Sequence, residues 1–422
     1  MRSTPWQVVL SCLVGLLPLA CVDPEDLTLN ATVDIIVVDG TVTNLAEPQV
    51  ILLNYSRADR LTGRFGSLPI TKAQVDVVMD SSLVIPAHET IDGHYQLPAD
   101  FKGQIGHAYQ LRLTLRDGSQ YASGQQVMPS ITHIDQIHAQ FNLKSLSPPL
   151  RGYYTAGHDV FIELQDPAQQ RNYYRWDWVD YEPQSWCRSC YQGFYSVYNV
   201  IGNELGNYRS GPDVYEECYT PSNIDPGSVI YSATFDYPCR TQCWEMVHSY
   251  TIALFDDRYA NGGLLPNFKV AAIPFYQHGP CLAQVRQSSL TPDAYQYYKL
   301  FQAQTQNTGG LADTPPTAPI GNVHNVANPK EVVVGYFTAS GVSTKSLYID
   351  RKDYQGVPLG YDPIKGYPQY QGGELFYALN SRNPNDEPSS PRLFIDQTPR
   401  PPTALCAPLD QRTPFKPEGW PN

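Results

Sequence analysis

Short runs of β-branched and aromatic residues, separated by Gly, Pro, Asn and Asp, recur along most of this chain of 422 residues. The clearest run contains Leu111, Leu113 and Leu115, each separated from the next by a polar residue. Successive side chains of a strand point to opposite faces, so this alternation indicates a strand with one buried and one exposed face. The pair Asp117-Gly118 that follows favours a tight hairpin turn. The sequence therefore predicts antiparallel sheet as the dominant structure.

The same pattern predicts strands at residues 35–42, 49–55, 74–79, 158–164, 173–180, 229–237, 247–255, 268–276 and 332–338. One segment has the features of a stable helix, and this helix is expected near residues 291–306. Thr291 can cap its N-terminus, and Pro292 suits the first helical position. The pair Gly309-Gly310 then ends the helical pattern. We therefore expect an all-β fold with one packed helix.

The length of the chain allows two domains with separate cores. Residues 30–130 are expected to form a β-sandwich that resembles immunoglobulin-like or transthyretin-like domains. A Ser- and Pro-rich linker at residues 144–149 leads into a larger β domain, expected over residues 150–380, which contains most of the cysteines. Residues 381–422 are rich in Pro, Asn and Asp, so we expect an irregular tail there.

The N-terminal residues determine the expected compartment. An apolar stretch from Val8 to Ala20 has the length of a signal peptide, and it is too short for a permanent membrane span. It ends at Cys21, and a small residue directly before a cysteine resembles the lipobox that lipoprotein signal peptidase cuts. We predict that residues 1–20 are removed, that Cys21 is acylated and anchors the protein in membrane lipid, and that residues 21–29 form a tether. The alternative is a secreted protein that is cut near Ala20 and carries no lipid.

Acidic residues follow the expected lipid anchor closely: Asp23, Glu25 and Asp26. They resemble the surface-export signal of Bacteroidota lipoproteins. This resemblance implies a protein of the outer membrane that is displayed on the cell surface. A solvated tether without any export information is the alternative.

Seven cysteines remain beyond Cys12 and Cys21, and they are Cys187, Cys190, Cys218, Cys239, Cys243, Cys281 and Cys406. Exported proteins in an oxidising compartment usually pair their thiols, so we expect two or three disulfides. At least one cysteine is left over because seven is odd, and the sequence does not determine the connectivity. The spacing of the first two and of Cys239 and Cys243 also permits a zinc site with four thiolates, which is one alternative. Reduced or partly paired thiols are another.

Two aromatic segments are candidates for a binding surface. Tyr174, Trp176 and Trp178 alternate along one predicted strand, which favours core packing over an exposed platform for a ligand. The loop at residues 186–219 is rich in Tyr, Gly and Asn, and loops on a rigid sheet often carry recognition. The candidate binding residues in this loop are Trp186, Tyr191, Tyr195 and Tyr198.

The sequence offers little support for catalysis or for a nucleic-acid partner. It contains no Gly-x-Ser-x-Gly elbow, His-Glu-x-x-His pair, phosphate loop or dinucleotide fingerprint, and its nine histidines are scattered singly. The formal charge of -12 argues against nucleic-acid binding, which requires clustered Lys and Arg. Asp256-Asp257 could bind a hard cation, but a solvated turn at a strand end is the default interpretation. We therefore predict no catalytic residues, no metal and no cofactor.

Several separate blocks, in a fixed order, resemble one known family. They are Asp166-Pro167-Ala168, Asn172 to Trp176, Cys243-Trp244, Ser288 to Thr291 with Tyr295, Leu300 and Gln304, Ile320 to Val323, and Gly335 to Ser340. The family is the uncharacterised Bacteroidota outer-membrane lipoproteins catalogued as domain-of-unknown-function family 4249. The resemblance implies a binding or accessory subunit, with a TonB-dependent outer-membrane barrel as its partner. A structural or assembly factor of the envelope and an unrecognised hydrolase are the alternatives.

Overall fold

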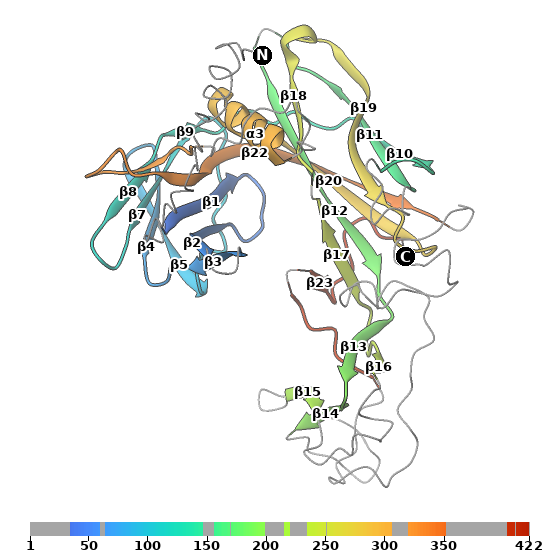
Figure 1. Ribbon diagram of the computed structural model, residues 1–422. Coiled ribbons are helices and arrows are strands. Elements are labelled where there is room, and N and C mark those ends of the chain that lie inside the picture. Colours follow the sequence, from blue (N-terminus) through green and yellow to red (C-terminus); the bar gives the residue numbers. More distant parts are fainter. Residues whose placement is uncertain are drawn as a thin grey trace, which may run out of the picture.

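The computed structural model describes residues 34–59, 64–146, 156–168, 170–198, 215–219, 234–249, 251–305, 320–351, 403–409 and 411–421. The predicted signal peptide, Cys21 and the tether lie outside these residues, as does about half of the predicted tail. Within the described ranges the fold is all-β with one α-helix, as the sequence predicts (Figure 1). None of the helical residues in these ranges forms a helix that is long and apolar enough to cross a membrane.

The first domain is a sandwich of short antiparallel strands. They are β1 Ile35–Thr43, β2 Val50–Asp59, β3 Arg64–Pro69, β4 Gln74–Met79, β5 Leu83–Ile91, β6 His94–Gln96, β7 Ala108–Thr114, β8 Gln120–Ser123 and β9 Gln126–Val127. The β5 strand pairs with β4 through its first half and with β6 through its second half, so it joins the two layers. The predicted hairpin is confirmed, since β7 pairs with β8 across the turn at Gly118, where φ is 87°. Leu111 and Leu113 are buried in the core of the sandwich.

Strands from much later in the chain complete this sandwich. The β21 strand, Val323–Asn325, pairs with β8. The β22 strand, Val333–Ile349, runs parallel to β1, with Ile36 opposite Val333 and Thr43 opposite Ser340. Val323 and Phe337 belong to the same buried core as the leucines of β7. The first domain therefore combines strands β1 to β9 with β21 and the first half of β22, which come about 200 residues later in the chain.

The second domain has two sheets that pack face to face. One sheet contains β12 Tyr173–Pro183, β17 Trp244–His248, β18 Ala253–Asp256, β20 Cys281–Ser289 and the second half of β22, with the short β23 Arg412–Thr413 at its edge. The other contains β10 Gln136–Asn142, β11 Gly157–Gln165 and β19 Leu264–Pro274. Tyr174, Trp176 and Trp178 are buried between the sheets. The predicted core role of these aromatic residues is therefore confirmed.

The β22 strand is shared by the two domains. Its residues up to Ser340 pair with β1, and its residues from Gly341 to Ile349 pair with β20. The side-chain amide of Asn44 adds a second link, because it donates to the Val342 carbonyl oxygen at 3.1 Å and accepts from the Val342 N–H at 2.5 Å. One continuous hydrogen-bonded strand therefore sets the position of one domain against the other.

The α3 helix, Pro292–Thr305, lies where the two domains meet (Figure 1). Thr291 Oγ1 accepts from the Ala294 N–H at 3.2 Å, which confirms the predicted cap. Ala294 and Tyr298 are buried in a small cluster with Tyr173 and Tyr336. The helix is therefore packed against β12 and β22, one strand from each side of the junction.

Two predicted strands differ most from the observed ones, and residues 229–233 of the strand predicted at 229–237 lie outside the described residues. The strand expected at residues 247–255 is wrong, because β17 ends at His248 and β18 begins at Ala253. Both pair with β12, but only Asp177 and Trp178 separate the two registers on β12, and Ser249, Thr251 and Ile252 belong to neither strand. The strand expected at residues 332–338 extends to Ile349, through Ser, Thr and Gly residues whose partners on β20 extend the pairing.

A third unit, the arm, projects from the second domain (Figure 1). It comprises β13 Trp186–Tyr191, β14 Phe194–Tyr198, β15 Tyr215–Tyr219 and β16 Thr234–Pro238, with residues 239–243 and 403–409. Three disulfides hold it: Cys187–Cys239, Cys190–Cys218 and Cys243–Cys406. The prediction of two or three disulfides is thus confirmed, and the four cysteines of the zinc alternative are distributed over these bridges. Cys281, buried in the second domain, is the one free cysteine among the described residues.

Candidate functional site

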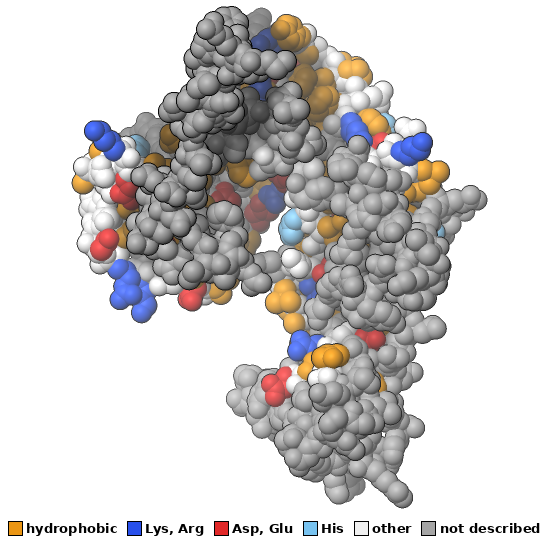
Figure 2. All heavy atoms as spheres, viewed as in Figure 1, with side chains coloured by type: hydrophobic (Ala, Val, Ile, Leu, Met, Phe, Trp, Pro, Cys, Tyr) orange, Lys and Arg blue, Asp and Glu red, His pale blue; other side chains and the backbone are white. Residues whose placement is uncertain are grey.

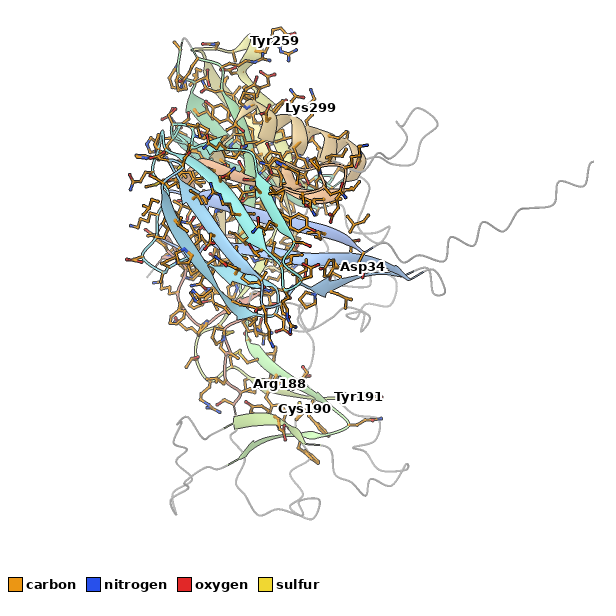
Figure 3. The ribbon with its side chains drawn as sticks, turned by 90° about the vertical axis from the view of Figure 1, so that its left-hand side faces the viewer. Asp34, Arg188, Cys190, Tyr191, Tyr259 and Lys299 are labelled. Carbon is orange, nitrogen blue, oxygen red and sulfur yellow. A yellow bond between two sulfur atoms is a disulfide. The ribbon has the colours of Figure 1, made fainter. Side chains whose placement is uncertain are left out.

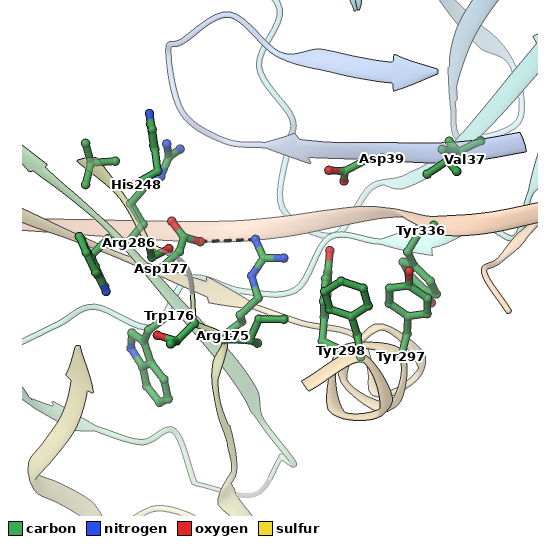
Figure 4. Close-up of a pocket in the computed structure, with 18 of the residues that line it drawn as sticks. Val37, Asp39, Arg175, Trp176, Asp177, His248, Arg286, Tyr297, Tyr298 and Tyr336 are labelled. Atoms are coloured by element: carbon green, nitrogen blue, oxygen red, sulfur yellow. Dashed lines mark hydrogen bonds and ion pairs between the residues drawn. The ribbon is translucent and has the colours of Figure 1, made fainter. Parts of the chain in front are cut away.

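A cavity of about 580 Å³ lies between the first and second domains and is called the cleft below (Figure 4). It is lined by β1, β12, β20, β22, α3 and the residues that connect β17 to β18. A second cavity of about 260 Å³ shares Asp39, Arg175, Asp177 and Arg286 with it, so the two adjoin. Figure 2 shows side chains of both charges at the inner face of this junction.

The break between β17 and β18 helps to form the cleft. Ser249, Thr251 and Ile252 lie outside the strands at this break, and all three line the cavity. Gly335 contributes at the opposite wall, where its φ is 98° and an added Cβ would lie 1.9 Å from the Val38 carbonyl oxygen. Only glycine permits such a close approach of β22 to β1. The backbone at Gly335 therefore brings the neighbouring Tyr336 to the edge of the cleft.

One wall of the cleft is aromatic. Tyr297 and Phe301 of α3 have ring centroids 6.4 Å apart, and Tyr297 lies 4.7 Å from the ring of Tyr336. Tyr298 lies beside them and is almost completely buried. Burial, with Tyr298 and Asp39 nearby, raises the pKa of Tyr297 to about 12. The Tyr297 hydroxyl therefore stays protonated at neutral pH.

The other walls carry charged side chains. The Arg175 guanidinium lies 4.5 Å from the centroid of the Tyr298 ring and 3.4 Å from a carboxylate oxygen of Asp177. Arg286 forms an ion pair with Glu47 of the first domain. Burial in the cleft raises the pKa of Asp39, and the charge of Arg175 opposes this rise. The Asp39 side chain is nevertheless exposed to solvent in the cleft, so the raised pKa does not mean that its carboxyl group is enclosed.

Asp39 differs from the other charged residues of the cleft. It makes no side-chain hydrogen bond and no ion pair within 4 Å among the residues that the structure describes. Its position on β1 places it across the cleft from the tyrosines of α3 (Figure 4). The cleft therefore offers one accessible carboxylate opposite an aromatic wall.

The sequence-predicted binding residues lie on the arm and not in the cleft. Tyr191 is 66% exposed and points outward (Figure 3), whereas Trp186 is half-buried. Tyr195 is 3% exposed and packs at 5.3 Å from Tyr237, so it belongs to the arm's interior and not to a contact surface. The side chain of Tyr198 lies outside the described residues. Cys21, the predicted lipidation site, also lies outside them.

The sequence alone does not reveal the cleft, although several of its residues lie in the blocks that resemble the family. Arg175 stands in the block from Asn172 to Trp176, and Gly335 and Tyr336 open the last of the blocks that carry the family resemblance. Those blocks were the available signal. They could not be assembled into a site, because Asp39 and Tyr336 come together only when β22 pairs with β1.

A second group of charged residues is completely buried where the arm joins the second domain. Arg351 donates to Glu182 at 2.6 Å, lies 3.7 Å from Asp180 and donates from Nε to His158 at 3.2 Å. Burial and the charge of Glu182 raise the pKa of Asp180 well above its usual value. Burial and the charge of Arg351 lower the pKa of His158 to about 3. Neither of the two cavities reaches these residues, so we assign the cluster a structural role.

The acidic pair Asp256-Asp257 is not a solvated turn, which corrects the default expectation. Asp257 is fully buried, and Asp256 pairs with Arg171 and Arg258 on the surface. The side-chain nitrogen of Asn172 lies 3.3 Å from Asp257 Oδ2 and 3.2 Å from Asp166 Oδ1. This N–H group thus occupies the space between the two buried carboxylates where a cation would otherwise lie.

Comparison with known proteins gives one match. The sequence profile of a family described as Domain of unknown function (DUF4249) matches residues 22–346. No curated protein and no solved structure matches the chain.

Proposed function

The chain belongs to the DUF4249 family, and on that premise we propose that it is a binding or accessory subunit of the outer envelope that captures a small organic ligand in the cleft. The observation that carries the proposal is the cleft itself. Its volume of about 580 Å³ falls within the range typical of small-molecule sites, and its lining combines aromatic walls with a few charged groups.

The construction of the cleft supports a binding role. Ligands bind more tightly to sites that are formed in advance, because less conformational freedom is lost on binding. Here β22 is hydrogen-bonded to both domains, and the ion pair between Arg286 and Glu47 joins them at the cavity that adjoins the cleft. The walls are therefore held at a fixed separation before any ligand arrives.

The remaining parts of the proposal concern location and partner. We place the protein at the outer membrane of a Bacteroidota-type envelope, anchored by acyl chains on Cys21 and displayed on the cell surface. Its partner in this proposal is a TonB-dependent barrel that receives the captured ligand. The arm supports a contact role, because Tyr191 is exposed at its surface and Tyr is favoured at protein interfaces.

The capture role can be tested by filling the cleft. Val37 lines the cavity from β1 and is partly exposed, so Val37→Trp adds bulk inside it. Val127, which is 52% exposed and does not line the cavity, offers a matched control as Val127→Trp. The full chain, purified in mild detergent from its own membrane, should carry a bound small molecule in native mass spectrometry. That molecule should be lost in Val37→Trp and kept in the control, and its absence from all three proteins would overturn the capture role.

The partner is tested separately by crosslinking in intact cells. The wild-type chain should crosslink to an outer-membrane barrel, and Tyr191→Ala should weaken this crosslink. An unchanged barrel complex in Val37→Trp would separate docking from capture. Recovery of the chain as a lone monomer, with no crosslinked barrel, would contradict the proposed partnership.

A further inference from the structure

The charged residues of the cleft and of the second cavity that adjoins it do not balance one another. Asp39, Glu47 and Asp177 are acidic, and Arg175 and Arg286 are basic. Each arginine has its own carboxylate, since Arg175 pairs with Asp177 and Arg286 pairs with Glu47. Asp39 therefore contributes one negative charge without a paired cation among the residues that the structure describes. A ligand with one positive charge would balance the negative charge of Asp39.

The aromatic wall opposite Asp39 suits the same kind of ligand. The faces of tyrosine rings carry negative electrostatic potential and attract cations that lie above them. The protein already uses this interaction in the cleft, because the Arg175 guanidinium lies 4.5 Å from the Tyr298 ring centroid. The neighbouring rings of Tyr297 and Phe301 also line the cavity and are partly exposed.

We infer that the ligand of the cleft is an organic cation, whose ammonium or guanidinium group pairs with Asp39 while its apolar part packs against Tyr297 and Phe301. This inference rests on the proposed function, since it assigns a chemical class to the ligand captured there. A neutral ligand would gain no ion pair with the Asp39 carboxylate. An anionic ligand would be repelled by Asp39 and would meet arginines that are already paired.

The experiment compares two probes of the same shape on the full chain. Benzylamine is cationic at neutral pH, and benzyl alcohol replaces the ammonium by a hydroxyl. Binding of each is measured by saturation-transfer-difference NMR titration at pH 7. We expect the wild type to bind benzylamine about tenfold more tightly than benzyl alcohol, a ratio that corresponds to about 1.4 kcal/mol.

Two charge-matched variants identify the residue responsible. Asp39→Asn should bring the two probes to nearly equal affinity. Asp100→Asn makes the same charge change at an exposed position of the first domain outside the cleft, and it should keep the preference. Asp39→Glu retains the charge and should keep most of the preference, which separates loss of charge from damage to the fold.

The possible results distinguish the ligand class from the binding role. Equal binding of both probes by the wild type, abolished by Val37→Trp, would overturn the cationic ligand and leave the cleft as a binding site. A preference for benzylamine that survives Asp39→Asn would also overturn it. Absence of saturable binding by benzylamine would overturn it as well, and the small molecule recovered from the native membrane would then decide the capture role independently.

Discussion

At the scale of single residues, Arg351 organises the most buried charges in the described chain. Its side chain is fully buried, and it contacts Asp180, Glu182 and His158. Transfer of charges from water into a protein interior is costly, and the cost is offset only when every group has a partner. Gln277 donates to Glu182 at 2.8 Å, so both oxygens of that carboxylate are satisfied. His158 stays neutral at neutral pH, because burial and the charge of Arg351 together lower its pKa to about 3.

The neutral state of His158 predicts acid sensitivity. Its pKa is about 3 in the folded protein and about 6.5 in the unfolded chain, so the unfolded chain binds more protons between these values. Stability therefore rises with pH across this window and is lost as pH falls below about 6.5, by at most about 1.4 kcal/mol per pH unit. His158→Gln keeps an acceptor for Arg351 and does not titrate, so its unfolding free energy should depend less on pH between 6.5 and 4. Urea denaturation at several pH values measures this, and equal pH slopes in both proteins would contradict it.

Residues differ in how far the sequence reveals their roles. Leu111 and Leu113 could be placed in the core, because alternation along a strand is a local property of the chain. The same holds for Trp176, which is buried as the pattern predicts. Asp39 could not be identified as a cleft residue, since its surroundings come from β12, α3 and β22. Tyr195 was misjudged for a related reason, because the disulfide-bonded core of the arm buries it.

At the scale of elements, the interruption between β17 and β18 shows why the cleft was not foreseeable. The segment 247–255 has the apolar and β-branched composition of one strand, and its composition alone predicts continuous pairing. The register of β12 decides otherwise, because it offers only two positions opposite residues 249–252. Register depends on tertiary pairing and not on local preference. The helix was predictable for the opposite reason, since its cap is encoded locally at Thr291.

The cap at Thr291 gives a prediction for α3. Thr291 Oγ1 accepts from the Ala294 N–H, and the same hydroxyl lies 3.0 Å from Gln126 Oε1 of the first domain. Thr291→Ala removes both bonds, and we expect a loss of about 0.5–2 kcal/mol in the free energy of unfolding. Thr291→Ser retains the hydroxyl and should restore most of that loss. Urea denaturation of the three proteins provides the measurement, and equal losses in both variants would show that the methyl group, and not the cap, matters.

The arm depends on its disulfides because its apolar core is small. Its buried residues are mostly the bridged cysteines and a few aromatic rings. Bridges that close loops typically stabilise a protein by about 2–4 kcal/mol each, and Cys243–Cys406 spans a sequence separation of 163. We expect a thiol reductant to lower the melting temperature of the full chain, and a strong chelator to leave it unchanged. A drop on chelation without reduction would instead indicate a metal held by these cysteines.

In the whole molecule, the β22 strand belongs to both domains, although the sequence predicts a boundary between them. Composition and the Ser- and Pro-rich segment at 144–149 place a boundary after the first sandwich. The chain returns to that sandwich with β21 and β22, after it has formed most of the second domain. Long-range pairing of this kind leaves no local trace in the sequence. It also means that the first sandwich, β1 to β9, lacks part of its own core.

The last prediction concerns a fragment that contains residues 30–142 alone. It lacks Val323, Val333 and Phe337, which are all buried in the core of the first sandwich, and β1 loses its parallel partner. Each such side chain contributes about 1.5–3 kcal/mol on burial, so the combined loss approaches the whole stability of a small domain, about 5–15 kcal/mol. We expect this fragment to show no cooperative thermal transition by circular dichroism. Joining residues 320–341 to it through a flexible Gly- and Ser-rich linker should restore one, because the missing strands can then pair as in the full chain. A cooperative transition of the same midpoint in both fragments would show that the sandwich folds without β21 and β22, and that β22 joins a domain which is already complete.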